Sequence, residues 1–98
     1  MKIIKVFYNG ECIEMDDDAK IVKKNNISVI LTRMEYNLLK IFLENKDKVL
    51  TRNKIIKLLG NTKMKERYVD VLVSRLRKKI GCCIQTRLGF GYGIIDNV

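Results

Sequence analysis

The sequence predicts an α+β fold in which a small antiparallel sheet precedes three helices and a C-terminal hairpin. Short β-branched runs separated by turn residues fill the first third of the chain. Two capped amphipathic stretches then lead to a basic one, and a glycine-rich segment follows it. With 98 residues, of which 47% are hydrophobic, the chain is long enough for a single domain, residues 1–98, with a modest core.

Residues 1–31 are predicted to form a four-stranded antiparallel sheet. Asn9-Gly10 separates the first two runs, and this dipeptide favours the positive φ angles of a type I′ hairpin turn. Acidic residues 16–18 and Asn25-Asn26 mark the next two turns. The acidic residues lack supporting metal ligands, so a solvated turn is expected there. The expected strands are Lys2–Tyr8, Glu11–Asp16, Ala19–Lys24 and Ile27–Leu31.

Residues 32–81 are predicted to form three helices. Thr32 and Glu35 have the spacing of a capping box, in which each side chain bonds the backbone N–H of the other. The helix that follows is predicted to end near residue 45. Thr51 can cap a second helix, Arg52–Leu59, and Gly60 is placed to end it. The first helix turns these apolar side chains towards a core: Met34, Leu38, Leu39, Ile41 and Phe42.

The third helix, at about residues 66–80, is amphipathic and basic, and Gly81 is placed to end it. One face carries an apolar stripe that is expected to pack against the core, and the opposite face carries cations with few acids. Such a face suits either solvent or a DNA groove, and the helix alone does not decide between them. The stripe contains Val69, Leu72, Val73, Leu76 and Ile80. The opposite face contains Arg67, Val71, Ser74, Arg75 and Lys78.

Residues 82–98 are predicted to form a hairpin whose tip is set by Gly89 and Gly91. A hairpin beside a recognition helix is a wing, so Thr86 and Arg87 are candidates for contacts with the DNA backbone or minor groove. The glycine-rich run does not lead into a helix, which argues against a nucleotide-binding loop.

Charge favours a nucleic-acid partner. The net charge is +9. Residues 1–50 hold nine cations and eight acids, whereas residues 51–98 hold eleven cations and three acids. This asymmetry indicates that residues 51–98 bind a polyanion. The basic helix lacks the broad apolar face that binds a membrane surface, so double-stranded DNA is the expected partner and no membrane is.

Other classes of protein are disfavoured. The sequence contains no histidine, which counts against an enzyme, and no cofactor site is expected. Cys12, Cys82 and Cys83 fit neither a disulfide framework nor zinc-ligand spacing. Reduced thiols and a cytoplasmic location are expected, since no export signal or membrane-spanning run is present.

Several motifs occur in an order that resembles the DNA-binding effector domain of OmpR/PhoB-type response regulators, over essentially the whole chain. The resemblance implies a winged helix-turn-helix whose third helix enters the major groove and whose wing reaches the neighbouring minor groove. The motifs are Leu31-Thr32-x-x-Glu35-Tyr36-x-Leu38-Leu39, Val49-Leu50-Thr51-Arg52, Arg67-x-Val69-Asp70-Val71, Leu76-Arg77-Lys78-Lys79-Ile80-Gly81, Gln85-Thr86 and Gly89-x-Gly91-Tyr92.

The resemblance also implies roles for single residues. Arg67 would hold a phosphate at the start of the third helix, and Arg75 is the first candidate for a bidentate contact with a guanine edge. Asp70 would pair internally with a cation such as Arg52. The other residues carried over as base-reading or nearby contacts are Tyr68, Val71 and Leu72, where Leu72 suits either core or groove. Those carried over as phosphate or wing contacts are Ser74, Arg77, Lys78, Thr86 and Arg87.

This sequence departs from the family pattern in the wing and in one connector. Leu88 stands where an arginine often precedes the first wing glycine, and Arg87 is one residue earlier, on the other face of a strand. Gly93 replaces a usual cation. The connector after Gly60 is short and lacks a common tryptophan, so the loop that would touch RNA polymerase is expected to be reduced. The alternative function is a winged-helix protein-interaction module with weakened or lost DNA reading.

The resemblance implies a place in two-component phosphorelay signalling. The receiver domain of such a regulator carries an acidic phosphoacceptor pocket that these residues do not supply. The chain is therefore expected to be the excised effector half of a response regulator, with an added methionine; a stand-alone binding domain is the alternative. A sensor histidine kinase would act only through the absent receiver domain. Two copies are expected on repeated half-sites.

Overall fold

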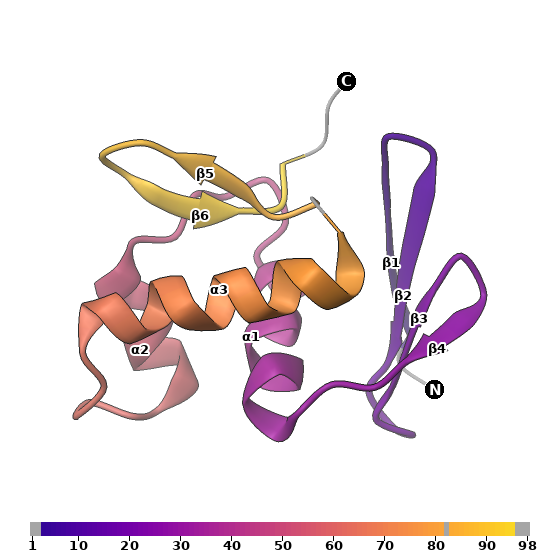
Figure 1. The fold of residues 1–98 in the computed structure, drawn as a ribbon, viewed down its shortest axis with the longest axis horizontal. Coiled ribbons are helices and arrows are strands. Elements are labelled where there is room, and N and C mark those ends of the chain that lie inside the picture. The colour runs from indigo at the N-terminus through magenta and orange to yellow at the C-terminus, as the bar shows by residue number, and fades with distance from the viewer. Residues whose placement is uncertain (1–2, 82, 96–98) are drawn as a thin grey trace.

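A computed structural model of the chain describes residues 3–81 and 83–95 and has the predicted order of elements. Figure 1 shows the four-stranded sheet at one end of the helical group and the hairpin running along α3. The predicted α+β fold class is confirmed, while Lys2, Cys82 and residues 96–98 lie outside the described residues. The elements are β1 (Ile3–Tyr8), β2 (Glu11–Asp16), β3 (Ile21–Lys24), β4 (Ile27–Val29), α1 (Arg33–Glu44), α2 (Arg52–Leu59), α3 (Glu66–Ile80), β5 (Gln85–Arg87) and β6 (Gly91–Gly93).

The N-terminal sheet is an antiparallel meander in the order β1-β2-β3-β4. Asn9 and Gly10 have φ angles of 50° and 79°, as the predicted type I′ turn requires. Side chains that alternate along the strands form one buried row against the helices. That row is paired across the strands as Val6 with Ile13 and Met15 with Val22, and all four are at most 3% exposed.

The turn between β2 and β3 is exposed at residues 18–20, as expected, and Asp17 also ties it to α1. The Tyr36 hydroxyl donates to Asp17 Oδ1 at 2.7 Å, and the ammonium groups of Lys20 and Lys40 lie 3.0 Å from the same carboxylate. Tyr36 and Lys40 are one helical turn apart, so both project from α1 towards the turn. These three donors hold the pKa of Asp17 well below its usual range.

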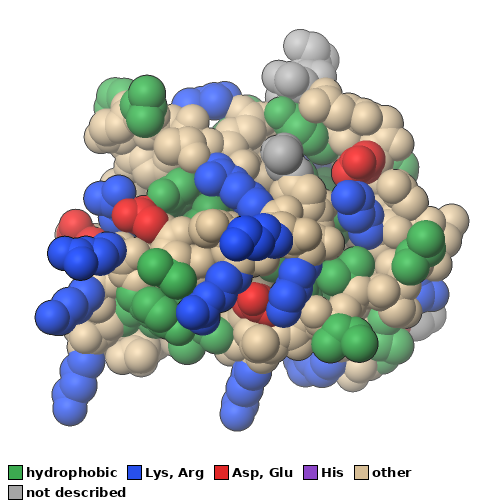
Figure 2. Space-filling model, in the orientation of Figure 1, with side chains coloured by type: hydrophobic (Ala, Val, Ile, Leu, Met, Phe, Trp, Pro, Cys, Tyr) green, Lys and Arg blue, Asp and Glu red, His purple; other side chains and the backbone are tan. Residues whose placement is uncertain are grey.

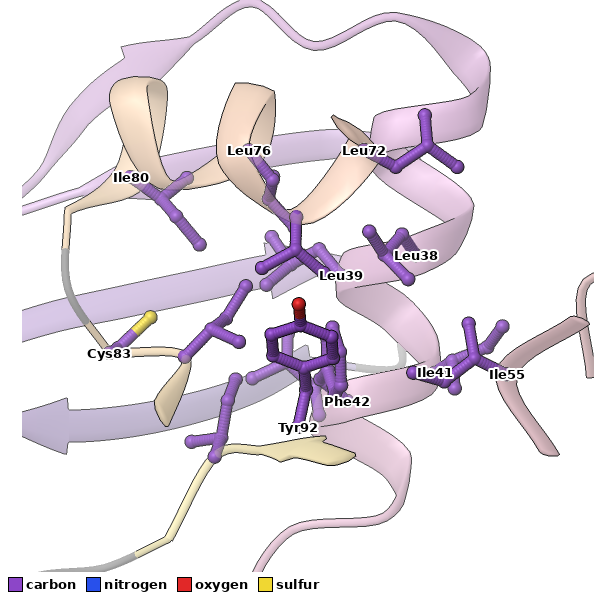
Figure 3. Packing of buried hydrophobic residues seen from close by; sticks show 14 of the residues in the cluster. Leu38, Leu39, Ile41, Phe42, Ile55, Leu72, Leu76, Ile80, Cys83 and Tyr92 are labelled. Carbon is purple, nitrogen blue, oxygen red and sulfur yellow. The ribbon is translucent and has the colours of Figure 1, made fainter. Parts of the chain in front are cut away.

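The helix boundaries follow the predicted caps. Thr32 and Glu35 form the capping box that opens α1, and Thr51 accepts from the Lys54 N–H at the start of α2. The apolar stripe of α3 is at most 1% exposed and packs against α1. Figure 3 shows side chains from these two helices pointing towards one another, and those it labels are Leu38, Leu39, Phe42, Leu72, Leu76 and Ile80.

Glu35 also joins α1 to α3. Its carboxylate is only 3% exposed and accepts from the Lys79 ammonium at 2.6 Å and from the Thr32 N–H at 2.9 Å. Burial opposes ionisation, but these contacts outweigh it and hold the pKa of Glu35 below its usual range. The end of α3 is therefore fixed to the start of α1.

The hairpin is anchored to the chain segment before α2. Leu50 and Tyr92 exchange backbone hydrogen bonds of 2.7 and 2.9 Å. This approach leaves no room for a side chain at the two glycines of β6: a Cβ on Gly91 would lie 2.0 Å from the Leu50 carbonyl oxygen, and one on Gly93 would lie 2.3 Å from that of Lys48. Close backbone packing thus explains the glycine at position 93. No described helix has the length and apolar character needed to span a membrane.

Candidate nucleic-acid interface

The exposed face of α3 carries most of the predicted contact residues. Figure 2 shows lysine and arginine side chains gathered across this side of the molecule. Tyr68 and Val71 are 39% and 38% exposed, so two apolar groups lie among the cations. We define the exposed face of α3 as Arg67, Tyr68, Val71, Ser74, Arg75 and Lys78; Glu66 and Lys79 are also exposed on this helix.

The cations of α3 fall into two groups. Within the described part of the chain, Arg67, Arg75 and Lys78 form no ion pair, whereas Lys79 is bound to Glu35. The N-cap residue Lys65 makes no side-chain hydrogen bond to the first turn of α3. The Tyr68 N–H of that turn donates to the Lys65 carbonyl oxygen at 2.9 Å, and Glu66 and Arg67 lie in the same turn. Arg67 is the cation placed to bind an anion at this helix start.

Leu72 is a core residue, which corrects its inclusion among the predicted DNA contacts. Its side chain is 1% exposed. It lies three residues after Val69 and four before Leu76, so it shares their buried stripe and cannot reach a groove.

Arg77 holds the wing against α3, a role that differs from the predicted phosphate contact. Its guanidinium donates from Nε and Nη2 to the Ile84 carbonyl oxygen, at 3.0 and 2.8 Å, and from Nη2 to Thr86 Oγ1 at 2.7 Å. The guanidinium carbon also lies 5.5 Å from the centre of the Tyr92 ring. A cation in such a stacked and multiply bonded position acts as an anchor.

Asp70 joins α2, α3 and β6. Arg52 Nε donates to Asp70 Oδ1 at 2.9 Å, which confirms the predicted pairing, and the Tyr92 hydroxyl donates to the same oxygen at 2.5 Å. The Tyr92 and Arg52 contacts hold the pKa of Asp70 below its usual range. Tyr92 is therefore fixed by its hydroxyl, its ring and its backbone.

The wing presents its own exposed residues next to α3. Thr86 and Arg87 are exposed on β5, although the Thr86 hydroxyl already accepts from Arg77. A cleft of about 330 Å³ separates the wing from the starts of α2 and α3. Its polar lining outside the turn consists of Thr51, Arg52, Asn53, Glu66, Thr86 and Arg87.

A three-helix core with an unpaired basic face on its third helix and a hairpin beside that helix defines a winged-helix domain of the DNA-binding class. The family described as "Transcriptional regulatory protein, C terminal" matches residues 25–94, and the chain belongs to this family. The predicted resemblance to effector domains of OmpR/PhoB-type response regulators is confirmed, and with it the class of function, DNA binding in transcription regulation.

Curated relatives are longer than this chain. It is 35% identical over 85 residues to the transcriptional regulatory protein QseB of Haemophilus influenzae, covering 84% of this chain and 38% of QseB. It is 36% identical over 88 residues to the sensory transduction protein BceR of Bacillus subtilis, covering 80% of this chain and 37% of BceR. The chain thus spans less than two thirds of the length of these relatives.

Solved structures of similar domains match nearly end to end. The DNA-binding domain of the response regulator AdeR, solved in complex with an intercistronic region, is 32% identical with a TM-score of 0.77, and the match covers 94% of this chain and 99% of that domain. The DNA-binding domain of Bacillus subtilis CssR is 31% identical with a TM-score of 0.75, covering 84% and 98%.

Proposed function

We propose that this domain binds a specific sequence of double-stranded DNA by placing α3 in the major groove. The observation that carries the proposal is the division of its cations. Arg52, Arg77 and Lys79 are bound to other residues of the domain, whereas the three cations on the exposed face of α3 have no acidic partner among the described residues. Unpaired cations on one helix face are suited to phosphates and base edges.

Each residue of the exposed face has a proposed role. Arg75, near the middle of α3, is proposed to donate to a guanine edge, and Tyr68 and Val71 to make apolar contacts in the groove. The proposed phosphate contacts are Arg67, Ser74 and Lys78, with Thr86 and Arg87 on the wing. Arg77 and Leu72 are left out, because the first anchors the wing and the second is buried.

The domain is proposed to be the effector half of a two-component response regulator. Its three proposed parts are an N-terminal sheet within residues 1–31, helices within 32–81 and a wing within 82–98. A sensor histidine kinase is proposed to act through a receiver domain outside this chain. The proposed site of action is the cytoplasm. Two copies are proposed to bind repeated half-sites, and the connector at residues 61–65 is proposed to meet RNA polymerase.

A titration by fluorescence anisotropy tests the proposal. Labelled duplex and single-stranded DNA are titrated with the 98-residue chain over a range of salt concentrations. Preferential binding to duplex is expected, with log K falling against log salt by about 0.9 for each phosphate neutralised. Binding that does not depend on salt, or no binding to duplex, would contradict the proposal. The second of these results would favour a protein-interaction module instead.

A further inference from the structure

The tip of the wing holds two large apolar side chains in solvent. Leu88 is 88% exposed and Phe90 is 74% exposed. They flank Gly89, whose φ of 81° suits a tight turn, and the Phe90 N–H closes that turn on the Arg87 carbonyl oxygen at 2.9 Å. This hydrogen bond closes the backbone turn, and both side chains project from it at the tip of the wing. Large apolar groups exposed together in this way indicate a binding surface.

The wing tip and the exposed face of α3 belong to one surface. Figure 2 shows hydrophobic atoms at the wing end of the side that carries the cations of α3. The cleft of about 330 Å³ lies between the tip and the starts of the helices. A major groove of about 12 Å admits a helix, whereas a minor groove of about 6 Å admits only a narrow element such as a hairpin tip. One sugar-phosphate strand separates the two grooves of a duplex, as the cleft separates the wing tip from the starts of α2 and α3.

We propose that Leu88 and Phe90 form an apolar wedge that enters the minor groove and partly unstacks one base step. This inference rests on the proposed DNA binding and adds a second kind of reading to it. Neither side chain can hydrogen-bond a base edge, and the minor groove offers few distinguishing edges. Apolar side chains instead pry base steps apart, and flexible pyrimidine–purine steps yield most easily. The wing therefore selects deformable DNA, while Arg87 beside it contacts a phosphate.

A fluorescent base analogue in the DNA tests the wedge. The wild-type chain first selects a duplex from a random pool, and 2-aminopurine is then placed at successive positions beside the half-site, where loss of stacking raises its fluorescence. Binding of the wild type is expected to raise the fluorescence at one step. The double variant Leu88→Ser with Phe90→Ser is expected to lose that rise and to bind about tenfold more weakly, as when an aromatic side chain that stacks on a base is removed.

Two further variants separate the wedge from other effects. Ile30→Ser is the matched control, because Ile30 is 89% exposed beside the N-terminal sheet, and it is expected to behave as the wild type. Leu88→Arg replaces an apolar group with a cation; it is expected to lose the fluorescence rise and to steepen the salt dependence by about 0.9. Circular dichroism checks that each variant is folded.

The outcomes distinguish the wedge from the proposed function. No rise at any position with the wild type, or an unchanged rise and affinity in the double variant, would overturn the wedge while leaving sequence-specific binding intact. An unchanged rise and affinity in the double variant is also the result expected if the wing tip binds another protein. A wild-type chain that enriches no duplex would instead overturn the proposed function.

Discussion

Arg75 and Arg77 are two residues apart on α3 and lie in opposite environments. Arg75 is exposed and forms no ion pair within the described residues, whereas Arg77 bonds Ile84 and Thr86 and stacks on Tyr92. The helical rotation of about 200° between them places one on the outer face and one against the wing. The arginine at position 75 is therefore available to a binding partner, whereas the arginine at position 77 stabilises the fold.

Replacement of Arg75 distinguishes base reading from phosphate binding. Arg75→Ala is expected to cost about 1–3 kcal/mol on the preferred duplex and to relax the preference at one base pair. Lys78→Ala is the comparison, expected to weaken binding to all sequences alike and to lower the salt slope by about one. Competition titrations against single-base variants of the duplex measure both effects. A uniform loss in Arg75→Ala would make Arg75 a phosphate contact.

The link between the N-terminal sheet and α1 depends on an ionised aspartate. Tyr36, Lys20 and Lys40 hold the pKa of Asp17 well below its usual range. The carboxylate is thus favoured in the folded state. Its stabilising effect is complete above the pKa of about 4 that an aspartate has in an unfolded chain, and is lost as the pH falls towards the lower folded-state pKa.

Substitution of Asp17 is expected to change how stability depends on pH. Asp17→Asn should lower the free energy of unfolding at neutral pH, and its difference from the wild type should shrink as the pH falls below about 4. Urea denaturation over this pH range measures the difference. Glu14→Gln is the control for removal of a carboxylate from the sheet, since Glu14 lies 4.0 Å from Lys5. A difference for Asp17→Asn that stays constant with pH would contradict the account.

The elements that the sequence predicted well are those with local signals. The capping box at Thr32, the cap at Thr51 and the Asn9-Gly10 turn each depend on residues a few positions apart. The contacts of Asp17 with Tyr36 and of Asp70 with Tyr92 join residues 19 and 22 positions apart, so no local pattern indicates them. For the candidate site, the face of α3 followed from periodicity, but Leu72 lies at the edge of the stripe, where periodicity does not separate core from surface.

The molecule as a whole separates structural charge from charge available to a partner. Its sheet half is nearly neutral, and the second half carries most of the net charge of +9. Ion pairs fix the helices relative to one another, Glu35 with Lys79 between α1 and α3 and Asp70 with Arg52 between α3 and α2. Hydrogen bonds of Arg77 and Tyr92 fix the wing to α3. The remaining cations on α3 face outward beside the wing. This arrangement presents one rigid surface that can contact two neighbouring grooves of a duplex.

Selection of bound DNA from a random duplex pool tests this account most directly. The wild-type chain is predicted to enrich one motif, present as a repeat, and to bind the enriched duplex at least about a thousandfold more tightly than a shuffled duplex of the same composition. Both affinities are measured at one stated salt concentration. Enrichment of no motif, or equal affinity for the enriched and shuffled duplexes, would contradict the claim that the exposed face of α3 reads DNA sequence.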